Sequence, residues 1–242
     1  MRITVKRLID IALAVFLLTI SLPVMAVAAV AIKLDTPGPV VFRQTRIGRH
    51  GRPFTIFKLR SMTVRGNSEP SCFDSDHTQR ITQTGWILRS TFIDELPQFL
   101  NVIIGDMSLV GPRPEMPHVV KGYTTLEKRR LTVKPGITGL WQISDCRGEP
   151  IHRNLKYDLF YVRNQSLALD AWVLFATLVL VLDFRRIGAN SRSAPVGRSR
   201  YRGPRNRVGI RESIRAGVEN IVHLATPGDA PSTAEKVSDD RF

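Results

Sequence analysis

The sequence predicts an α+β protein: an apolar membrane segment at the N-terminus, followed by a mostly helical domain with a few short strands. Three observations lead to this expectation. Residues 11–32 carry no charge, residues 40–58 hold two strand-like stretches around a turn, and apolar residues recur at helical spacing between 92 and 103. At 242 residues, the chain can bury one sizeable core and still carry appendages.

The composition favours an anionic partner. The net charge is +14, with 35 Lys and Arg against 21 Asp and Glu. This balance suits nucleic acid, anionic lipid or phosphorylated substrates. Aromatic residues are only 7% of the chain, which does not indicate a base-stacking surface. Cys72 and Cys146 have no metal-ligand spacing, and we expect them to be free thiols in a reducing compartment.

The uncharged run at 11–32 is long enough to cross a bilayer. Three interpretations are open. The first is a cleaved signal peptide, which the basic start and the small residues at 24–28 would suit. The second is a simple spanning helix. The third is a re-entrant helix–break–helix that enters one leaflet, bends and leaves on the same side.

Two features favour the re-entrant interpretation. Pro23 lies in the middle of the run, where it removes a backbone donor and predicts a break or kink, and Ser21 can bond a carbonyl nearby. Basic residues also flank both ends, and positive flanks prefer the cytoplasm, so a spanning helix would have to export one of them. These flanking residues are Arg2, Lys6 and Arg7 before the run, and Lys33, Arg43, Arg46, Arg49 and Arg52 after it.

The next unit predicts a β-hairpin. Residues 40–42 and 53–58 have strand character around the turn at 48–51. Most of its arginines suit a solvated surface near anionic lipid. Lys58 and Arg60 alternate with apolar residues and can face a phosphate site instead. Residues 66–79 are polar and are expected to form a mobile loop.

The most informative stretch carries two adjacent carboxylates, Asp94 and Glu95, just before Pro97. We expect a helix over 80–102, on which neighbouring residues lie about 100° apart, so both carboxylates can address one cation or phosphate. A structural alternative is also open, because Thr91 and Asp94 have the spacing of a helix-capping box.

Gly111-Pro112-Arg113-Pro114 predicts a stiff turn that fixes the direction of Arg113, whose planar guanidinium suits phosphate oxygens. Beyond it we expect a helix at 115–133, a loop at 134–139 and a strand at 140–144. Asp158 is expected to pair with an arginine. Residues 166–183 predict an apolar helix, either in the core or at a membrane interface.

The expected organisation has three parts: a basic N-terminus and membrane helix at 1–33, a domain at 34–185 and a C-terminal extension at 186–242. The extension is rich in arginine, glycine, serine and proline. It predicts a mostly disordered tail, apart from a weak helix around 210–224.

Four short motifs follow one another along this sequence. They are Asp-Glu-Leu-Pro-Gln at 94–98, Asn-Val at 101–102, Gly-Asp-Met-Ser-Leu-Val-Gly-Pro-Arg-Pro at 105–114 and Lys-Pro-Gly-Ile-Thr-Gly at 134–139. This series resembles the bacterial sugar transferase family, the monotopic polyprenyl-phosphate phosphoglycosyl transferases. The resemblance covers about residues 4–185. It is to the compact form, similar to the glycosyl-1-phosphate transferases that prime exopolysaccharide synthesis.

The resemblance implies a cytosolic catalytic domain with interfacial amphipathic helices at the bacterial inner membrane. It implies transfer of a sugar-1-phosphate from a UDP-sugar to undecaprenyl phosphate, with release of UMP and with Mg²⁺. Asp94 would be the nucleophile, and Glu95 would hold the metal or take a proton. The expected phosphate-binding residues are Lys58, Arg89, Arg113 and Arg147. Arg147 lies in Asp145-Cys146-Arg147-Gly148, about where many relatives have a Gly-Arg pair.

Two other classes of function are open. One is a non-catalytic, membrane-anchored basic scaffold that binds anionic partners. The other is a nucleic-acid-binding protein, which the charge alone suggests and the segment at 11–32 disfavours, so we expect no nucleic acid partner. Self-association into a homodimer is left open.

Overall fold

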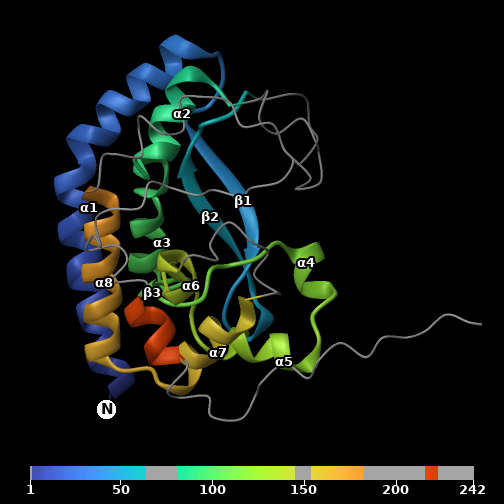
Figure 1. The fold of residues 1–242 in the computed structure, drawn as a ribbon. Helices are drawn as coiled ribbons and strands as arrows, with labels where there is room; N and C mark the ends of the chain where they lie inside the picture. The colour runs from blue at the N-terminus through green and yellow to red at the C-terminus, as the bar shows by residue number, and fades with distance from the viewer. Residues whose placement is uncertain (1, 64–80, 145–153, 183–215, 223–242) are drawn as a thin grey trace, which may run out of the picture.

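The computed structural model describes residues 2–63, 81–144, 154–182 and 216–222 (Figure 1). The longer helices are α1 (Arg2–Asp35), α2 (Gln83–Ser90), α3 (Gln98–Ile104), α7 (Leu155–Arg163) and α8 (Leu167–Leu182). The short helices are α4 (Pro117–Lys121), α5 (Thr125–Lys128) and α6 (Leu140–Ile143), with 3₁₀ turns η1 (Arg49–Gly51), η2 (Ile93–Glu95) and η3 (Arg129–Thr132). The strands are β1 (Val41–Ile47), β2 (Pro53–Leu59), β3 (Ser108–Val110) and β4 (Gly136–Thr138).

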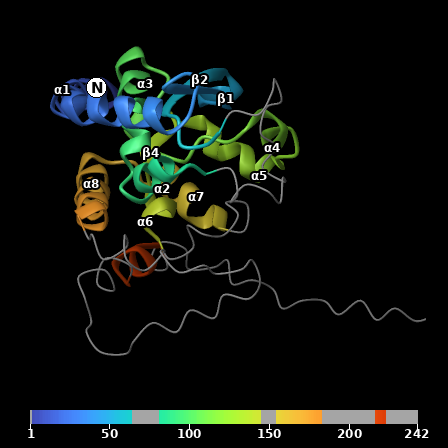
Figure 2. The ribbon, with the colours of Figure 1, turned by 90° about the horizontal axis from the view of Figure 1, so that it is seen from above.

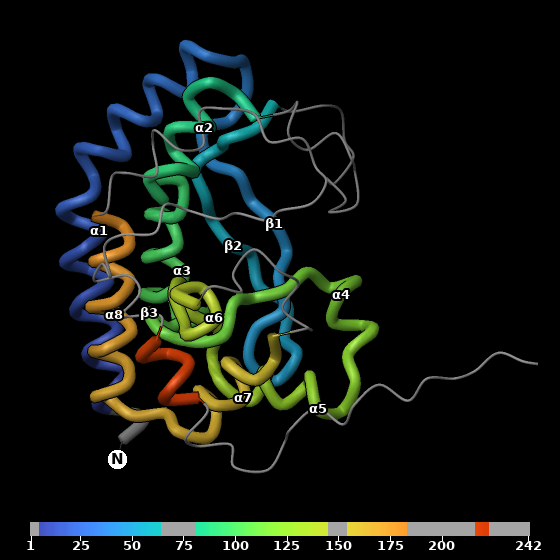
Figure 3. Tube along the Cα trace, viewed as in Figure 1, coloured from blue at the N-terminus to red at the C-terminus, as the bar shows by residue number. Residues whose placement is uncertain are grey.

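The N-terminal segment forms one continuous helix, α1, with Pro23 inside it. The expected break at Pro23 is therefore not present, although the axis of α1 changes direction along its length (Figure 3). Ser21 Oγ donates to the carbonyl of Leu18 at 2.9 Å, and not to that of Thr19, the carbonyl that Pro23 leaves without its helical partner. The neighbouring turns thus accommodate the proline without ending the helix. The predicted boundary between 33 and 34 falls in the last turn of α1.

The first turns of α1 are bonded to the domain. Lys6 Nζ lies 2.6 Å from Asp170 Oδ2 on α8, and Arg7 donates to the carbonyl of Val102 at the end of α3. Asp10 is buried and accepts a hydrogen bond from Ser108 Oγ on β3. A buried carboxylate needs such partners, so these contacts fix the start of the helix to three separate elements.

The last turn of α1 is bonded to the same domain. Arg60, at the end of β2, is buried and donates to the carbonyls of Thr36 and Pro37, both at 2.6 Å. The Asp35 carboxylate accepts from the backbone N–H of Thr84 at the start of α2. This hydrogen bond lowers the pKa of Asp35. An α-helix of this length is about 50 Å long. The domain therefore accompanies α1 from one end to the other.

Between these attachments, α1 has a buried face and an exposed apolar face. Ala14, Ser21, Ala28 and Ile32 are buried against the domain. The residues from Val5 to Asp35 are long and apolar enough to cross a membrane. α8 lies beside the N-terminal part of α1 (Figures 1 and 2) and also exposes large apolar side chains. The exposed set is Leu8, Phe16, Ile20, Val27 and Val30 on α1, with Phe175, Leu178 and Leu182 on α8.

The predicted hairpin is confirmed: β1 and β2 pair antiparallel, with Val41 opposite Leu59. A second, parallel pair joins β3 to β4. The expected loop at 134–139 therefore contains a strand, and the expected strand at 140–144 is the helix α6 instead. The strand follows from Gly136, whose missing side chain lets β4 lie directly against the backbone of Gly111. The helix α6 begins after Gly139, its N-cap, which also packs on Gly111.

The long helices expected at 80–102 and 115–133 are also wrong. The first is divided into α2, η2 and α3, and the second into α4, α5 and η3. Thr124 begins α5 with a capping box to Glu127, which starts a new helix inside the predicted one. The mobile loop predicted at 66–79 lies outside the described residues.

The core lies between the hairpin, α3, α6, α7 and α8, and it includes Val102, Met107 and Tyr157. A helix at 216–222, red in Figure 1, also contributes to it. Val218 and Val222 of this helix are buried in the core cluster. This helix lies within the weak helix predicted around 210–224, the exception to the predicted disorder, and its two valines share one helical face because they lie at positions i and i+4. The rest of the extension lies outside the described residues.

We expect Gly136→Ala to destabilise the protein. A Cβ there would lie 2.1 Å from the backbone nitrogen of Gly111 and 2.4 Å from the carbonyl oxygen of Thr138. Neither backbone atom can move aside without disturbing β3 and β4, so the cost is about 2 kcal/mol, or a Tm lower by roughly 4–8 °C. Thermal unfolding in detergent measures this. Gly122→Ala is the control, because its nearest contact is 3.6 Å away, and an equal loss there would contradict the explanation.

Candidate active site

The acid pair lies on the 3₁₀ turn η2, between α2 and α3. Phe92, the residue before this turn, has φ 59°, a left-handed conformation that costs free energy for a bulky side chain. Pro97 then starts α3. This sharp reversal, and not a continuous helix, directs Asp94 into the domain, where only 8% of the residue is exposed.

The capping alternative for Asp94 is wrong. η2 has Phe92 as its N-cap, with no side-chain hydrogen bond. Thr91 Oγ1 donates to the carbonyl of Ile87 instead, so it serves the preceding helix α2. A buried carboxylate that ties down no helix end is a candidate for chemistry.

Glu95 is held by two cations that come from other elements. Lys58, on β2, donates from Nζ to Glu95 Oε1 at 2.7 Å. Arg113, in the turn after β3, places one guanidinium nitrogen 3.7 Å from the same oxygen. The structure therefore brings together four of the predicted residues: Asp94, Glu95, Lys58 and Arg113.

The two carboxylates differ in their electrostatics. Burial raises the pKa of Asp94 to about 6, and the negative charge of Glu95 adds to this effect, while Lys58, Arg89 and Arg113 oppose it. Burial would also raise the pKa of Glu95, but Lys58 and Arg113 outweigh it and hold that pKa below its usual range. Burial lowers the pKa of Lys58. Glu95 is thus the fixed anion of the pair, and Asp94 titrates near neutrality.

The remaining predicted residues have different outcomes. Arg89 lies in the last turn of α2, where its charge lowers the pKa of Asp94 from a distance. Arg147 lies outside the described residues. Pro23 of α1 lines a groove beside the acid pair, and Ser21, two residues earlier, is buried.

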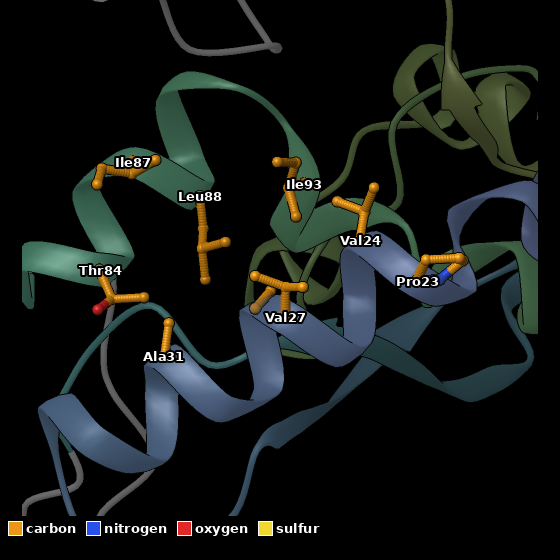
Figure 4. A pocket seen from close by; sticks show the side chains of 9 residues that line it. Pro23, Val24, Val27, Ala31, Thr84, Ile87, Leu88 and Ile93 are labelled. Carbon is orange, nitrogen blue, oxygen red and sulfur yellow. The ribbon is translucent and has the colours of Figure 1, made fainter.

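The groove is apolar, has a volume of about 450 Å³ and lies between α1 and α2 (Figure 4). One of its lining residues is Ile93, the residue before Asp94. The sequence analysis did not predict this groove. The signal for it was present, because the small and apolar residues of α1 that line the groove recur at the spacing of one helical face. The lining residues are Pro23, Val24, Val27, Ala28 and Ala31 of α1, Thr84, Ile87 and Leu88 of α2, and Ile93.

The acid pair fits Mg²⁺ only with help from a ligand. Among the described residues, no group of three or more Asp, Glu, His or Cys side chains could hold a metal ion. Mg²⁺ in phosphoryl-transfer sites is commonly held by one or two carboxylates together with substrate phosphate oxygens. Asp94 and Glu95 supply those two carboxylates, with Lys58 and Arg113 beside them for the phosphates.

Comparison with known proteins places the chain in a family. The sequence profile described as "Bacterial sugar transferase" matches residues 1–184, and the chain belongs to this family. The predicted resemblance is therefore confirmed, and a match of this extent covers every described element except the helix at 216–222.

Three relatives illustrate the range of similarity. A "UDP-glucose:undecaprenyl-phosphate glucose-1-phosphate transferase" of Klebsiella pneumoniae is 42% identical over 185 residues, covering 72% of this chain and 39% of that protein. "Uncharacterized sugar transferase EpsL" of Bacillus subtilis is 41% identical over 177 residues, covering 73% and 87%. A "UDP-N-acetylgalactosamine-undecaprenyl-phosphate N-acetylgalactosaminephosphotransferase" of Aeromonas hydrophila is 39% identical over 184 residues, covering 74% and 44%. The chain thus spans less than half of the length of the first and third.

We expect Asp94→Asn to stabilise the protein above about pH 7. The pKa of Asp94 in the folded chain, about 6, is raised above its ordinary value. Its contribution to stability is therefore fully present below about pH 4 and is lost as the pH rises through about 6. Asparagine does not titrate, so the variant keeps this stability, and its Tm should exceed that of the unsubstituted protein at neutral pH but not at about pH 4.

Asp35→Asn is the control, with the opposite sign. The pKa of Asp35 is lowered by its bond from Thr84, so removing this carboxylate should lower the Tm at neutral pH. Thermal scans across the pH range measure both variants. Equal Tm values for Asp94→Asn and the unsubstituted protein above pH 7 would contradict the buried, high-pKa assignment.

Proposed function

We propose that this chain transfers a sugar-1-phosphate from a UDP-sugar to undecaprenyl phosphate and releases UMP. One observation carries the proposal: a buried acid pair, with Lys58 and Arg113 beside it, directly follows Ile93, which lines an apolar groove between α1 and α2. A soluble, anionic donor needs a charged surface and a lipid acceptor needs an apolar one, and the reaction requires that the two surfaces meet. The names of the Klebsiella pneumoniae and Aeromonas hydrophila relatives describe this reaction with different sugars.

The proposed route is covalent. A carboxylate oxygen of Asp94 attacks the β-phosphorus of the donor, the bond from that phosphorus to the bridging oxygen breaks, and UMP leaves with the bonding electrons. This step leaves an aspartyl phospho-sugar. The phosphate of the acceptor then attacks the same phosphorus, which frees Asp94 and forms the polyprenyl diphosphate sugar. With a pKa of about 6, Asp94 is mostly ionised at neutral pH, yet it is poorly solvated, as a carboxylate nucleophile requires.

The surrounding charges support a diphosphate donor. The planar guanidinium of Arg113 and the compact ammonium of Lys58 can both bind phosphate oxygens, and Arg89 adds positive charge. We include Arg147 among the phosphate-binding residues from the family resemblance. Mg²⁺ would be held by Asp94 and Glu95, and it would supply charge neutralisation for the diphosphate. Glu95 positions this ion or accepts a proton from the acceptor.

The proposed membrane arrangement is monotopic and re-entrant, with the domain on the cytosolic face of the inner membrane. Its support is that both ends of α1 are bonded to one domain, Lys6 to Asp170 at the start and Arg60 to Thr36 at the end. A helix that crossed the bilayer would place these attachments on opposite sides. The basic residues at both flanks favour the cytosolic side for each.

The groove supplies the surface that a polyprenyl chain requires. It is formed on one side by α1, whose opposite face exposes large apolar side chains. Burying a branched hydrocarbon there contributes roughly 25 cal/mol for each Å² removed from water. Because Ile93 lines the groove and Asp94 follows it, a chain seated there brings its phosphate to the acid pair. We place the activity at the priming step of exopolysaccharide or another glycoconjugate.

We expect Asp94→Asn to abolish UMP release while membrane association persists. The assay uses a panel of UDP-sugars with undecaprenyl phosphate, because the relatives' names include more than one sugar. The loss should be at least about 10³-fold, since the proposed nucleophile is removed. Asp106→Asn is the control, because this neighbouring acid lies beyond α3 and should leave turnover intact.

Labelled donor, rapid quenching and peptide mapping should locate the sugar-phosphate on the peptide that contains Asp94. Near-normal turnover of Asp94→Asn, or label on another peptide, would overturn the nucleophile assignment. Absence of UMP release with every donor in the panel would favour the scaffold alternative.

The membrane arrangement has its own test. Single cysteines introduced at Val5 and at Lys33, both exposed in α1, are labelled with a membrane-impermeant maleimide in a cysteine-free chain. We expect both sites to react in inverted inner-membrane vesicles and neither in intact spheroplasts, since both ends of α1 lie on the cytosolic side. Reaction of one site from each side would show a spanning helix.

A further inference from the structure

The backbone of Arg113 is hydrogen-bonded by a buried arginine, Arg130. Arg130, on η3, donates to the carbonyl oxygen of Arg113 at 2.8 Å and forms an ion pair with Asp158 of α7 at 2.7 Å. It also donates to the hydroxyl of Tyr123. Arg130 and Asp158 are both almost fully buried, so neither can exchange its partner for water. The position of the Gly-Pro-Arg-Pro turn thus depends on where α7 places Asp158.

α7 is itself held by the C-terminal helix at 216–222. Tyr157, the fully buried residue before Asp158, donates its hydroxyl hydrogen to Glu219. Val218 and Val222 are buried in the same core cluster as Tyr157. The helix also contacts α8, because Gly217 lies against the ring of Trp172. A segment outside the range of the family match therefore completes the packing around α7.

We propose that residues 216–222 are a C-terminal clasp that positions Arg113 for the donor, acting through Tyr157 and Asp158 of α7 and through Arg130. This proposal rests on the proposed function, in which Arg113 binds the donor's diphosphate. The clasp touches no reacting atom. It works because Tyr157 and Asp158 are adjacent on one short helix, so a shift that follows loss of Glu219 also moves the partner of Arg130.

The energetics favour a real coupling over a passive contact. Undocking the clasp removes two buried valines from the core and leaves the hydroxyl of Tyr157 buried without its acceptor. α7 can relieve this only by moving. Because the ion pair with Arg130 is almost fully buried, a displaced Asp158 leaves an uncompensated charge unless η3 and the turn at 111–114 follow it.

The test uses the full chain with Val218→Asp, which places a charge in the core and undocks the clasp. We expect a roughly five- to tenfold rise in donor KM, the size of one weakened guanidinium–phosphate contact, with little change in acceptor KM. Glu219→Gln is the milder second variant and should shift donor KM in the same direction. Lys156→Ala is the control: it removes an exposed ion pair to Glu219 and a cation–π contact over the Tyr157 ring. It keeps the hydrogen bond from Tyr157 to Glu219 and should leave donor KM unchanged.

Two further measurements distinguish positioning from loss of folded protein. A synthetic peptide of residues 210–226 should restore donor KM in Val218→Asp. Asp158→Asn combined with Val218→Asp should raise donor KM little more than either change alone, since both act on one path. A fall in kcat that matches the loss of folded enzyme, with donor KM unchanged, would overturn the proposal, as would additive effects.

Hydrogen–deuterium exchange provides a readout that needs no activity. Val218→Asp should speed exchange in α7, in η3 and at 111–114, while exchange in α2, which packs on α1 and η2, stays unchanged. Faster exchange confined to 216–222 would overturn the clasp. If the unsubstituted protein releases no UMP from any donor, the proposed function fails, and this exchange pattern still decides whether the clasp exists.

Discussion

The ion pair between Lys58 and Glu95 is the interaction on which the site depends. Two carboxylates side by side in a poorly solvated position repel each other and lose hydration. Lys58 compensates one of them at 2.7 Å, with Arg113 on the same oxygen. This compensation lets the other, Asp94, remain buried with a pKa of about 6. The pair also joins β2 to η2, so the hairpin and the acid pair form one rigid unit.

Helix α1 is part of this unit. α1 is bonded to the domain at its first and last turns, and its small buried residues, such as Ala14 and Ala28, let the domain approach it closely. The opposite face is apolar and exposed. The groove beside Ile93 is lined by both α1 and α2, with Val27 and Ala31 among the α1 residues. Helix packing and site geometry are therefore set by the same residues.

The sequence predicted what local patterns determine. The hairpin follows from strand-forming stretches around a turn, α8 from an uninterrupted apolar run, and the candidate site from adjacent carboxylates beside a proline. It failed where distant contacts decide. The left-handed conformation of Phe92, which divides the expected helix at 80–102, leaves no trace in hydrophobic periodicity.

The same limit applies to the other corrections. Trp141 and Ile143 favour a strand by composition, yet they follow a glycine that packs on Gly111, and a helical turn results. The pairing of Lys58 with Glu95 and the docking of Val218 join residues far apart in sequence. Nothing in the local pattern around either partner specifies the other.

The ion pair between Lys6 and Asp170 sets an order of events during synthesis. The two residues are 164 positions apart. At about 5–20 residues per second, the ribosome needs on the order of 10–30 s to add the stretch between them. Throughout that time Lys6 can pair only with nearby residues such as Asp10, which lies four positions on in α1 and 3.7 Å away in the folded chain. The start of α1 therefore reaches its final set of contacts only after α8 has emerged, which makes this attachment a late step in synthesis.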